Sequence, residues 1–442
     1  MRVVPSAAGV VTSGFSIRRF RAVTGSLALI AAAVVGCAYS IVSAGSIRPG
    51  SFESILDRTQ RARGIRVAAP VEPRVITRRE LPALLRRAAL ADASEAEFHR
   101  YEQSLVAVGL WPPDRALLEA FIELGASEVA GLYVPSERTV YVVSDPRMPF
   151  SMRLASMLSR RDWMREFVLA HELVHLLQHQ AHPELIDWIE TPVGQDDAGY
   201  AVQAAIEGDA VRYGLEALGG SIVLPDPEEF REGSESEAYR GAFAQAPALI
   251  RVTFLFAYTG GYRLSYFEGS DLLAAPPASS EQVLHADRRR EAFVTIDLGA
   301  LHARLPAGCH FLYENTMGEL GISVLLREAG EGDRRDAWEG WDGDRYLVAR
   351  CAGGLEFLWI SVWDSESDAL EFAQAYRELA GPLAARAGLG SVPGVTLIGR
   401  EVVASTAAVA PLVGSLAGAS RRTRVATLDE LFGALRARRV LR

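Results

Sequence analysis

Two histidines and a glutamate within five residues are the strongest chemical signal in the sequence. His171 and His175 lie four residues apart on either side of Glu172, in the run HELVHLLQ that ends at Gln178. Residues four apart share one face of a helix, so both imidazoles could bind one Zn²⁺ while Glu172, one step round, reaches a metal-bound water. The pattern predicts a zinc site with Glu172 as general base. The alternative is a pair of core histidines beside a carboxylate.

A catalytic zinc needs a third protein ligand and a fourth position for water. The metzincin pattern requires Gly at 178 and His at 181, whereas this chain has Gln178 and Ala181. The gluzincin pattern instead places a Glu on a later helix. Glu207 fits it, because it lies in the run AAIEGDA, whose small residues allow close helix approach, on a helix predicted over 198–218. We expect Glu207 to be the third ligand, with a solvated helix-face carboxylate as the alternative. The lesser candidates are Asp196, Asp197 and Asp209.

A donor that stabilises the developing oxyanion is predicted in the run PASSEQVLH. Glu281 and His285 are four residues apart there, and a helix that begins at Ser279 or Ser280 would place them on one face. We expect His285 to hydrogen-bond the oxyanion and Glu281 to orient its imidazole. A structural histidine packed against the zinc helix is an equal alternative.

Together these motifs resemble the gluzincin-type zinc metallopeptidases, and more closely a bacterial and archaeal group of exported proteins with HELxHxLQ followed by EGxA. The resemblance spans about residues 131–376 and rests on GLY at 131–133, HELVHLLQ, EGDA at 207–210, PASSEQVLH at 277–285, GWDGDR at 340–345 and Trp363-Asp364.

The resemblance implies a zincin fold, in which helices surround a small sheet and an edge strand aligns an extended peptide above the metal. In that picture Thr139–Val143 is the edge strand and binds substrate by β-augmentation. One departure stands out. Better-known gluzincins carry an Asp four residues after the ligand Glu, but position 211 is Val. Another residue must therefore orient the ligand His.

The N-terminus predicts export and a membrane anchor. Arg18, Arg19 and Arg21 precede an apolar stretch over 22–35, which meets Gly36-Cys37 in the manner of a bacterial lipobox. We expect residues 1–37 to be a signal whose Cys37 is lipidated, or else an uncleaved anchor. Either way the chain is extracytoplasmic and membrane-anchored. Residues 38–79 are predicted to be a tether.

The remaining chain predicts an α+β protein. A mainly helical zincin-like domain with a small sheet is expected over 80–290, followed by a smaller α+β accessory domain over 291–442. Because an exported protein folds in an oxidising compartment, Cys309 and Cys351 could form a disulfide.

Composition narrows the function classes. A formal net charge of −9 disfavours nucleic-acid binding, and 23% charged residues with 49% hydrophobic ones exclude a disordered chain. The sequence thus predicts a membrane-anchored zinc-dependent peptidase that acts on peptides or proteins. The alternative is an envelope binding or assembly lipoprotein that keeps a zincin fold without cleaving anything.

Overall fold

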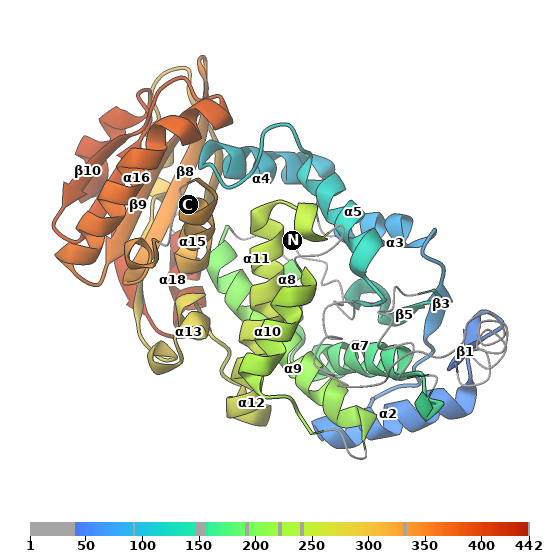
Figure 1. The fold of residues 1–442 in the computed structure, drawn as a ribbon. Helices are drawn as coiled ribbons and strands as arrows, with labels where there is room; N and C mark the ends of the chain where they lie inside the picture. The colour runs from blue at the N-terminus through green and yellow to red at the C-terminus, as the bar shows by residue number, and fades with distance from the viewer. Residues whose placement is uncertain are drawn as a thin grey trace, which may run out of the picture.

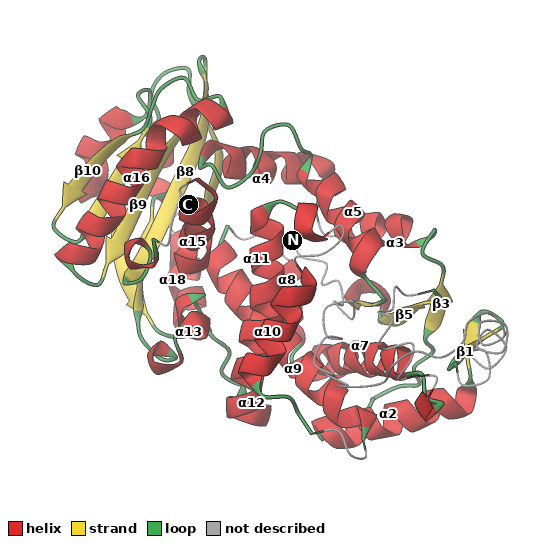
Figure 2. Ribbon diagram, viewed as in Figure 1, coloured by secondary structure: helices red, strands yellow, loops and turns green. Residues whose placement is uncertain are grey.

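The computed structural model describes residues 40–91, 93–145, 156, 158–190, 194–219, 223–238, 243–329 and 334–440. As expected, the protein is α+β: in the described residues a mainly helical first half carries a small three-stranded sheet and a two-stranded one, and the second half is built on a larger five-stranded sheet beside another two-stranded one (Figures 1 and 2). The predicted signal over 1–37, with Cys37, lies outside the described residues. Among the residues described, no helix is both long and apolar enough to cross a bilayer.

The helices of the first half are α2 (Pro49–Arg63), α3 (Leu81–Ala89), α4 (Glu95–Ala107), α5 (Leu117–Glu128), α7 (Trp163–Ala181), α8 (Pro183–Glu190), α9 (Asp196–Leu218), α10 (Pro227–Ala238), α11 (Ala248–Leu255), α12 (Gly261–Glu268) and α13 (Glu281–Leu284). Its strands are β1 (Val42–Ser43), β2 (Ser46–Ile47), β3 (Arg74–Ile76), β4 (Gly131–Val134) and β5 (Thr139–Val143).

The helices of the second half are α14 (Gly299–His302), α15 (Gly318–Ala329), α16 (Glu366–Ala387), α17 (Leu416–Ala419) and α18 (Leu428–Val440). Its strands are β6 (Phe293–Asp297), β7 (His310–Asn315), β8 (Trp341–Cys351), β9 (Gly354–Trp363), β10 (Gly394–Ile398), β11 (Glu401–Ser405) and β12 (Arg421–Val425).

The small sheet of the first half has the order β3-β5-β4. Strand β5 pairs with β4 in antiparallel register, Tyr141 opposite Leu132, and with β3 in parallel register, Tyr141 opposite Arg74. The prediction that Thr139–Val143 is an edge strand is therefore wrong. Both sides of this strand already carry neighbours, so a substrate peptide cannot add to it.

The predicted tether over 38–79 is also wrong, because most of it belongs to the folded body. The backbone N–H of Ile41 donates to Asp162 at 3.1 Å, and α2 packs against α7 and α9 with Ile55 and Arg63 buried. Strand β3 then joins the small sheet. The buried face of α2 combines an isoleucine with polar and charged side chains, so it lacks the apolar periodicity that predicts a core helix.

The larger sheet is antiparallel throughout and has the order β10-β11-β9-β8-β7. Helix α16 lies across one face (Figure 1). Alternate residues of β8 enter different clusters: Tyr346 and Val348 join the core shared with α16, whereas Leu347 and Ala349 join a second core with β6. Both faces of the sheet are thus covered.

One hydrophobic core runs through both halves of the molecule. It includes Leu105 of α4 and Val202 of α9 together with Leu320 of α15, Trp359 of β9 and Phe372 of α16. The aromatic side chains of Trp359 and Phe372 are therefore core residues. The helical half and the sheet half pack as one body around them.

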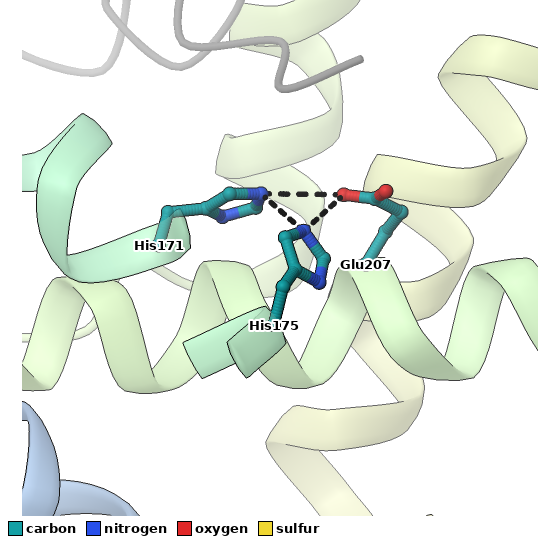
Figure 3. A group of neighbouring side chains, drawn as sticks. All are labelled: His171, His175 and Glu207. Atoms are coloured by element: carbon teal, nitrogen blue, oxygen red, sulfur yellow. Dashed lines mark hydrogen bonds and ion pairs between the residues drawn. The ribbon is translucent and has the colours of Figure 1, made fainter. Parts of the chain in front are cut away.

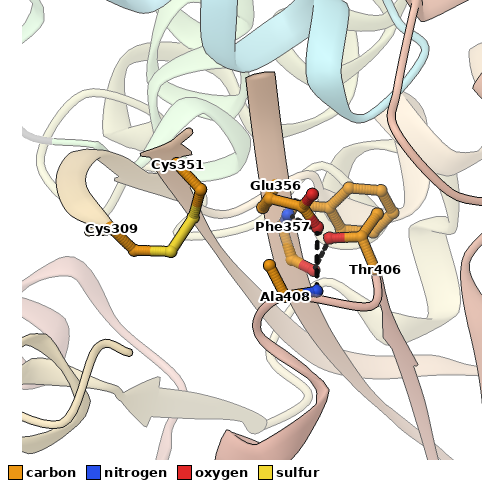
Figure 4. Close-up of a disulfide and its surroundings, with 6 residues drawn as sticks. All are labelled: Cys309, Cys351, Glu356, Phe357, Thr406 and Ala408. Carbon is orange, nitrogen blue, oxygen red and sulfur yellow. Dashed lines mark hydrogen bonds between the residues drawn. A yellow bond between two sulfur atoms is a disulfide. The ribbon is translucent and has the colours of Figure 1, made fainter. Parts of the chain in front are cut away.

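A disulfide joins Cys309, just before β7, to Cys351 at the end of β8, as predicted (Figure 4). The two cysteines flank the paired residues His310 and Arg350. The bridge therefore closes the open end of the β7–β8 pair, across a sequence separation of 42 residues.

Removing this bridge should destabilise the protein. On the chain-entropy model a loop of this length contributes about 3 to 4 kcal/mol. We expect Cys309→Ser/Cys351→Ser to unfold at lower denaturant concentration than the wild type. Dithiothreitol should lower the wild-type midpoint toward that of the double variant and leave the double variant unchanged. A wild-type midpoint insensitive to the reductant would contradict a stabilising disulfide.

Candidate metal centre

Helix α7 carries the HExxH residues in the interior of the helical half. It buries almost every residue from Met164 to Gln178, because β4 and β5 cover one side and α2 and α9 the other. Its N-terminal end is fixed by Asp162, which accepts from Arg165 at 3.0 Å and from the backbone of Ile41. The helix is thus a rigid, fully packed support for the residues that it carries.

His171, His175 and Glu207 converge, as predicted, and their side chains point toward one another (Figure 3). One Glu207 carboxylate oxygen, Oε2, lies 3.3 Å from His171 Nε2 and 3.6 Å from His175 Nε2, and the two nitrogens are 3.1 Å apart. One ligand atom from each residue lies within 4.8 Å of the others. Two imidazoles and a carboxylate are a ligand set that suits Zn²⁺.

The small residues around Glu207 bring its helix close to α12. A Cβ atom at Gly208 would lie 1.9 Å from the carbonyl oxygen of Gly261, and one at Gly261 would lie 1.9 Å from that of Ala204. Side chains at these positions would force the helices apart. The run AAIEGDA therefore has the packing role that the sequence predicted, and it fixes the position of Glu207.

The buried carboxylate of Glu207 makes this group of three residues suitable for a bound cation. Both Glu207 oxygens are buried and have no hydrogen-bond partner among the described residues. Burial alone would raise the pKa of Glu207, but His175 and His171 lower it to about 2. Burial would lower the pKa of His175, but Glu207 and Glu172 raise it to about 9. A divalent cation between these groups would compensate the buried carboxylate charge, so the residues fit a metal ion.

Glu172 lies on the same helix, beside the ligands. Its Oε2 accepts the backbone N–H of Tyr133 in β4 at 2.7 Å. Gly131 allows this approach, because a Cβ there would lie 2.4 Å from Val168 and 3.0 Å from Glu172 Cγ. Strand β4 thus holds the predicted general base in place.

Gln178 contacts His175, the role for which the expected Asp at position 211 was absent. Its Oε1 lies 2.8 Å from His175 Nδ1, while its amide nitrogen donates to Asp209 at 2.8 Å. Val211, where the Asp would lie, is instead a buried apolar residue. The sequence contained the signal for Gln178, because a residue three positions after His175 lies on the same helical face.

His171 has neighbours that sequence reasoning missed. The ring of Tyr258 stacks on its imidazole with centroids 6.1 Å apart, and Phe167 lies 5.8 Å away. Tyr258 belongs to a π-helical turn, Phe256–Gly260, that packs against α9. Nothing in the local sequence pattern indicated this irregular turn.

The lesser ligand candidates lie outside the metal group. Asp196 accepts from the Tyr101 hydroxyl, and Asp197 accepts the backbone N–H of Ser280 at 2.9 Å. Asp209 bonds Gln178 as described and forms an ion pair with Arg63 at 3.0 Å. Glu207, which is completely buried, is also not the solvated carboxylate of the alternative.

The predicted Glu281–His285 pair is wrong. Helix α13 ends at Leu284 and His285 has extended backbone angles, so the two side chains do not share a helical face. His285 Nε2 instead lies 2.8 Å from Glu319, and Glu281 accepts from Arg288 at 2.8 Å. The hydrogen bond with Glu319 raises the pKa of His285, against burial. We therefore leave His285 out of the proposed catalytic residues.

The family comparison concerns the second half. A family model described as a domain of unknown function, DUF8575, matches residues 310–407. These residues run from β7 to the end of β11 and include α15 and α16, so the match covers the five-stranded sheet with its two helices. No curated protein and no solved structure matches the chain.

The geometry predicts one zinc ion per chain, bound by His171, His175 and Glu207. Loss of a residue that only hydrogen-bonds a metal ligand typically lowers metal affinity about 10- to 100-fold. Glu207→Gln should weaken zinc binding by more than this, because it removes a ligand itself. Chelator competition on the purified chain measures this affinity. Asp196→Asn is the matched control, and it should bind zinc as tightly as the wild type. Equal zinc affinity in the wild type and Glu207→Gln would remove Glu207 from the ligand set.

Proposed function

We propose that the protein is a zinc-dependent peptidase. The observation that carries the proposal is the number and kind of ligands: the candidate group contains two histidines and one glutamate, and no fourth His, Cys, Asp or Glu among the described residues joins it. Structural zinc sites are completed by four protein ligands, whereas catalytic sites leave one position for water. A three-residue group therefore favours catalysis.

The chemistry that a bound Zn²⁺ supplies is Lewis acidity, which acidifies a water and polarises a peptide carbonyl. Glu172 accepts the proton of the attacking water and then delivers it to the leaving amine. The Tyr133 N–H keeps one of its oxygens fixed during this transfer. His171, His175 and Glu207 hold the metal, and Gln178 orients His175.

The proposed location is the outer face of the cytoplasmic membrane, with an anchor at or before Cys37. Only residues 38–40 separate Cys37 from Ile41, whose backbone is bonded to Asp162 at the start of α7. The four residue steps from Cys37 to Ile41 span at most about 14 Å. The metal domain would therefore lie directly at the membrane, which favours membrane proteins and peptides close to the bilayer as substrates.

Burial of the site favours one alternative function. The side chains of His171, Glu172 and Glu207 are at most 1% exposed. Such burial also suits an envelope binding or assembly lipoprotein that keeps the zincin fold and holds zinc without cleaving peptides. Turnover of a peptide library by the zinc-loaded chain distinguishes the two functions.

Glu172→Gln should keep the metal and lose peptidase activity. The amide cannot act as a base, and loss of general base catalysis typically costs about 10²- to 10⁴-fold in rate. Zinc content and digestion of a peptide library by the full chain measure the two effects separately. The control is Glu184→Gln, a change at an exposed glutamate of α8, which should leave both unchanged. If the zinc-loaded wild type digests nothing in the library, the binding protein becomes the better proposal.

A further inference from the structure

A chain of buried polar contacts connects α2 to the metal centre. Arg63, in the last turn of α2, forms an ion pair with Asp209 of α9, which accepts from Gln178 of α7, which in turn contacts His175. We propose that Arg63 is a positioning residue of the metal centre and acts on His175 through Asp209 and Gln178. This inference rests on the proposed metal site and names a residue and a helix outside the zinc motifs.

The hydrogen bonds of Gln178 determine which nitrogen of His175 faces the metal. The Gln178 amide nitrogen lies 2.9 Å from the carbonyl oxygen of Ile206 and 2.8 Å from Asp209 Oδ2. Both partners are acceptors, so the NH₂ group must face them and Oε1 must face His175 Nδ1. Nδ1 therefore carries a proton, which leaves the Nε2 lone pair of His175 for the metal.

Asp209 is one of the two acceptors that set this orientation, and its ion pair with Arg63 keeps it in place. The carboxylate is fully buried, and the contact with Arg63 Nε at 3.0 Å is its ion pair in the described structure. A buried carboxylate that loses its cation becomes strongly unfavourable and moves or recruits another donor. Either response would remove one of the two acceptors of the Gln178 amide and leave only the carbonyl of Ile206 to hold it.

The structure fixes Arg63 itself on several sides. Its guanidinium lies 5.0 Å from the centre of the Tyr213 ring, and its side chain is only 5% exposed. Helix α2 ends immediately afterwards, where Gly64 adopts left-handed angles and its N–H bonds the carbonyl of Gln60. The docking of α2 thus sets where the guanidinium lies.

Arg58 offers a matched comparison on the same helix. It also joins α2 to the metal-bearing helices, through Glu166 of α7 at 2.9 Å and the carbonyl of Ala217 of α9 at 2.7 Å. Neither of these partners bonds a metal ligand. Loss of Arg58 should therefore weaken the docking of α2 without disturbing the orientation of His175.

The test measures zinc affinity of the full chain by chelator competition, together with the visible absorption spectrum of the cobalt(II)-substituted protein. Arg63→Met and Gln178→Met should each weaken zinc binding about 10- to 100-fold and alter the cobalt spectrum. Arg63→Lys keeps the positive charge and should restore most of the affinity. Arg58→Met should lower the thermal unfolding temperature but keep zinc affinity within about twofold of the wild type.

Two results would overturn the inference. One is wild-type zinc affinity and cobalt spectrum in Arg63→Met. The other is an equal loss of affinity in Arg58→Met and Arg63→Met, which would show that α2 acts through stability alone. If Arg63→Met does not fold, Gln178→Met and Arg63→Lys still test the proposal. Unchanged zinc affinity in Gln178→Met would contradict the proposed series of contacts from Arg63 to His175. A wild-type protein that binds no zinc would instead refute the proposed function.

Discussion

The packing of α9 against its neighbours at backbone distance is the constraint on which the candidate metal centre depends. The proposed ligands come from two helices, and their donor atoms must meet within a few ångströms. Gly208 allows α9 to touch α12, because a Cβ there would lie 1.9 Å from the carbonyl oxygen of Gly261. A larger residue at Gly208 would have to displace the backbone of Gly261, and Glu207 would move with it.

The site was more predictable from the sequence than the elements around it. HExxH is a local pattern that helical spacing explains, and Glu207 followed from the resemblance to the gluzincin pattern together with the small residues around it. The central position of β5 was not predictable, because its parallel partner β3 lies some 65 residues earlier, at Arg74–Ile76, and nothing local specifies that pairing. Helix α2 was missed because its buried positions include the polar Thr59 and the charged Arg63, and the ion-pair partner of Arg63 comes from a distant segment.

Two motifs of the sequence proved to have packing roles, GWDGDR within the second half and PASSEQVLH between the two halves. In GWDGDR, Asp344 is fully buried and accepts four N–H groups, from the backbone of Met317 and Gly318 at the start of α15 and from the indoles of Trp341 and Trp359. In PASSEQVLH, Ser280 bonds Asp197 of α9 through its N–H. Ser280 Oγ also accepts the N–H of Leu320 of α15. A carboxylate or serine in a distinctive motif can thus serve packing as fully as chemistry.

The burial of the metal centre also has a kinetic consequence. His175 is the most exposed of the four central residues at 5%, and Glu172 and Glu207 are completely covered. A polypeptide cannot reach these atoms in this conformation, so a substrate of the proposed peptidase would have to bind a more open one. The apparent affinity for substrate would then scale with the population of the open form. An open form populated at about 1% would weaken substrate binding about 100-fold. An effector or a membrane contact that favours the open conformation would raise turnover at subsaturating substrate concentration. It would do so without contacting the three proposed metal-binding residues or Glu172.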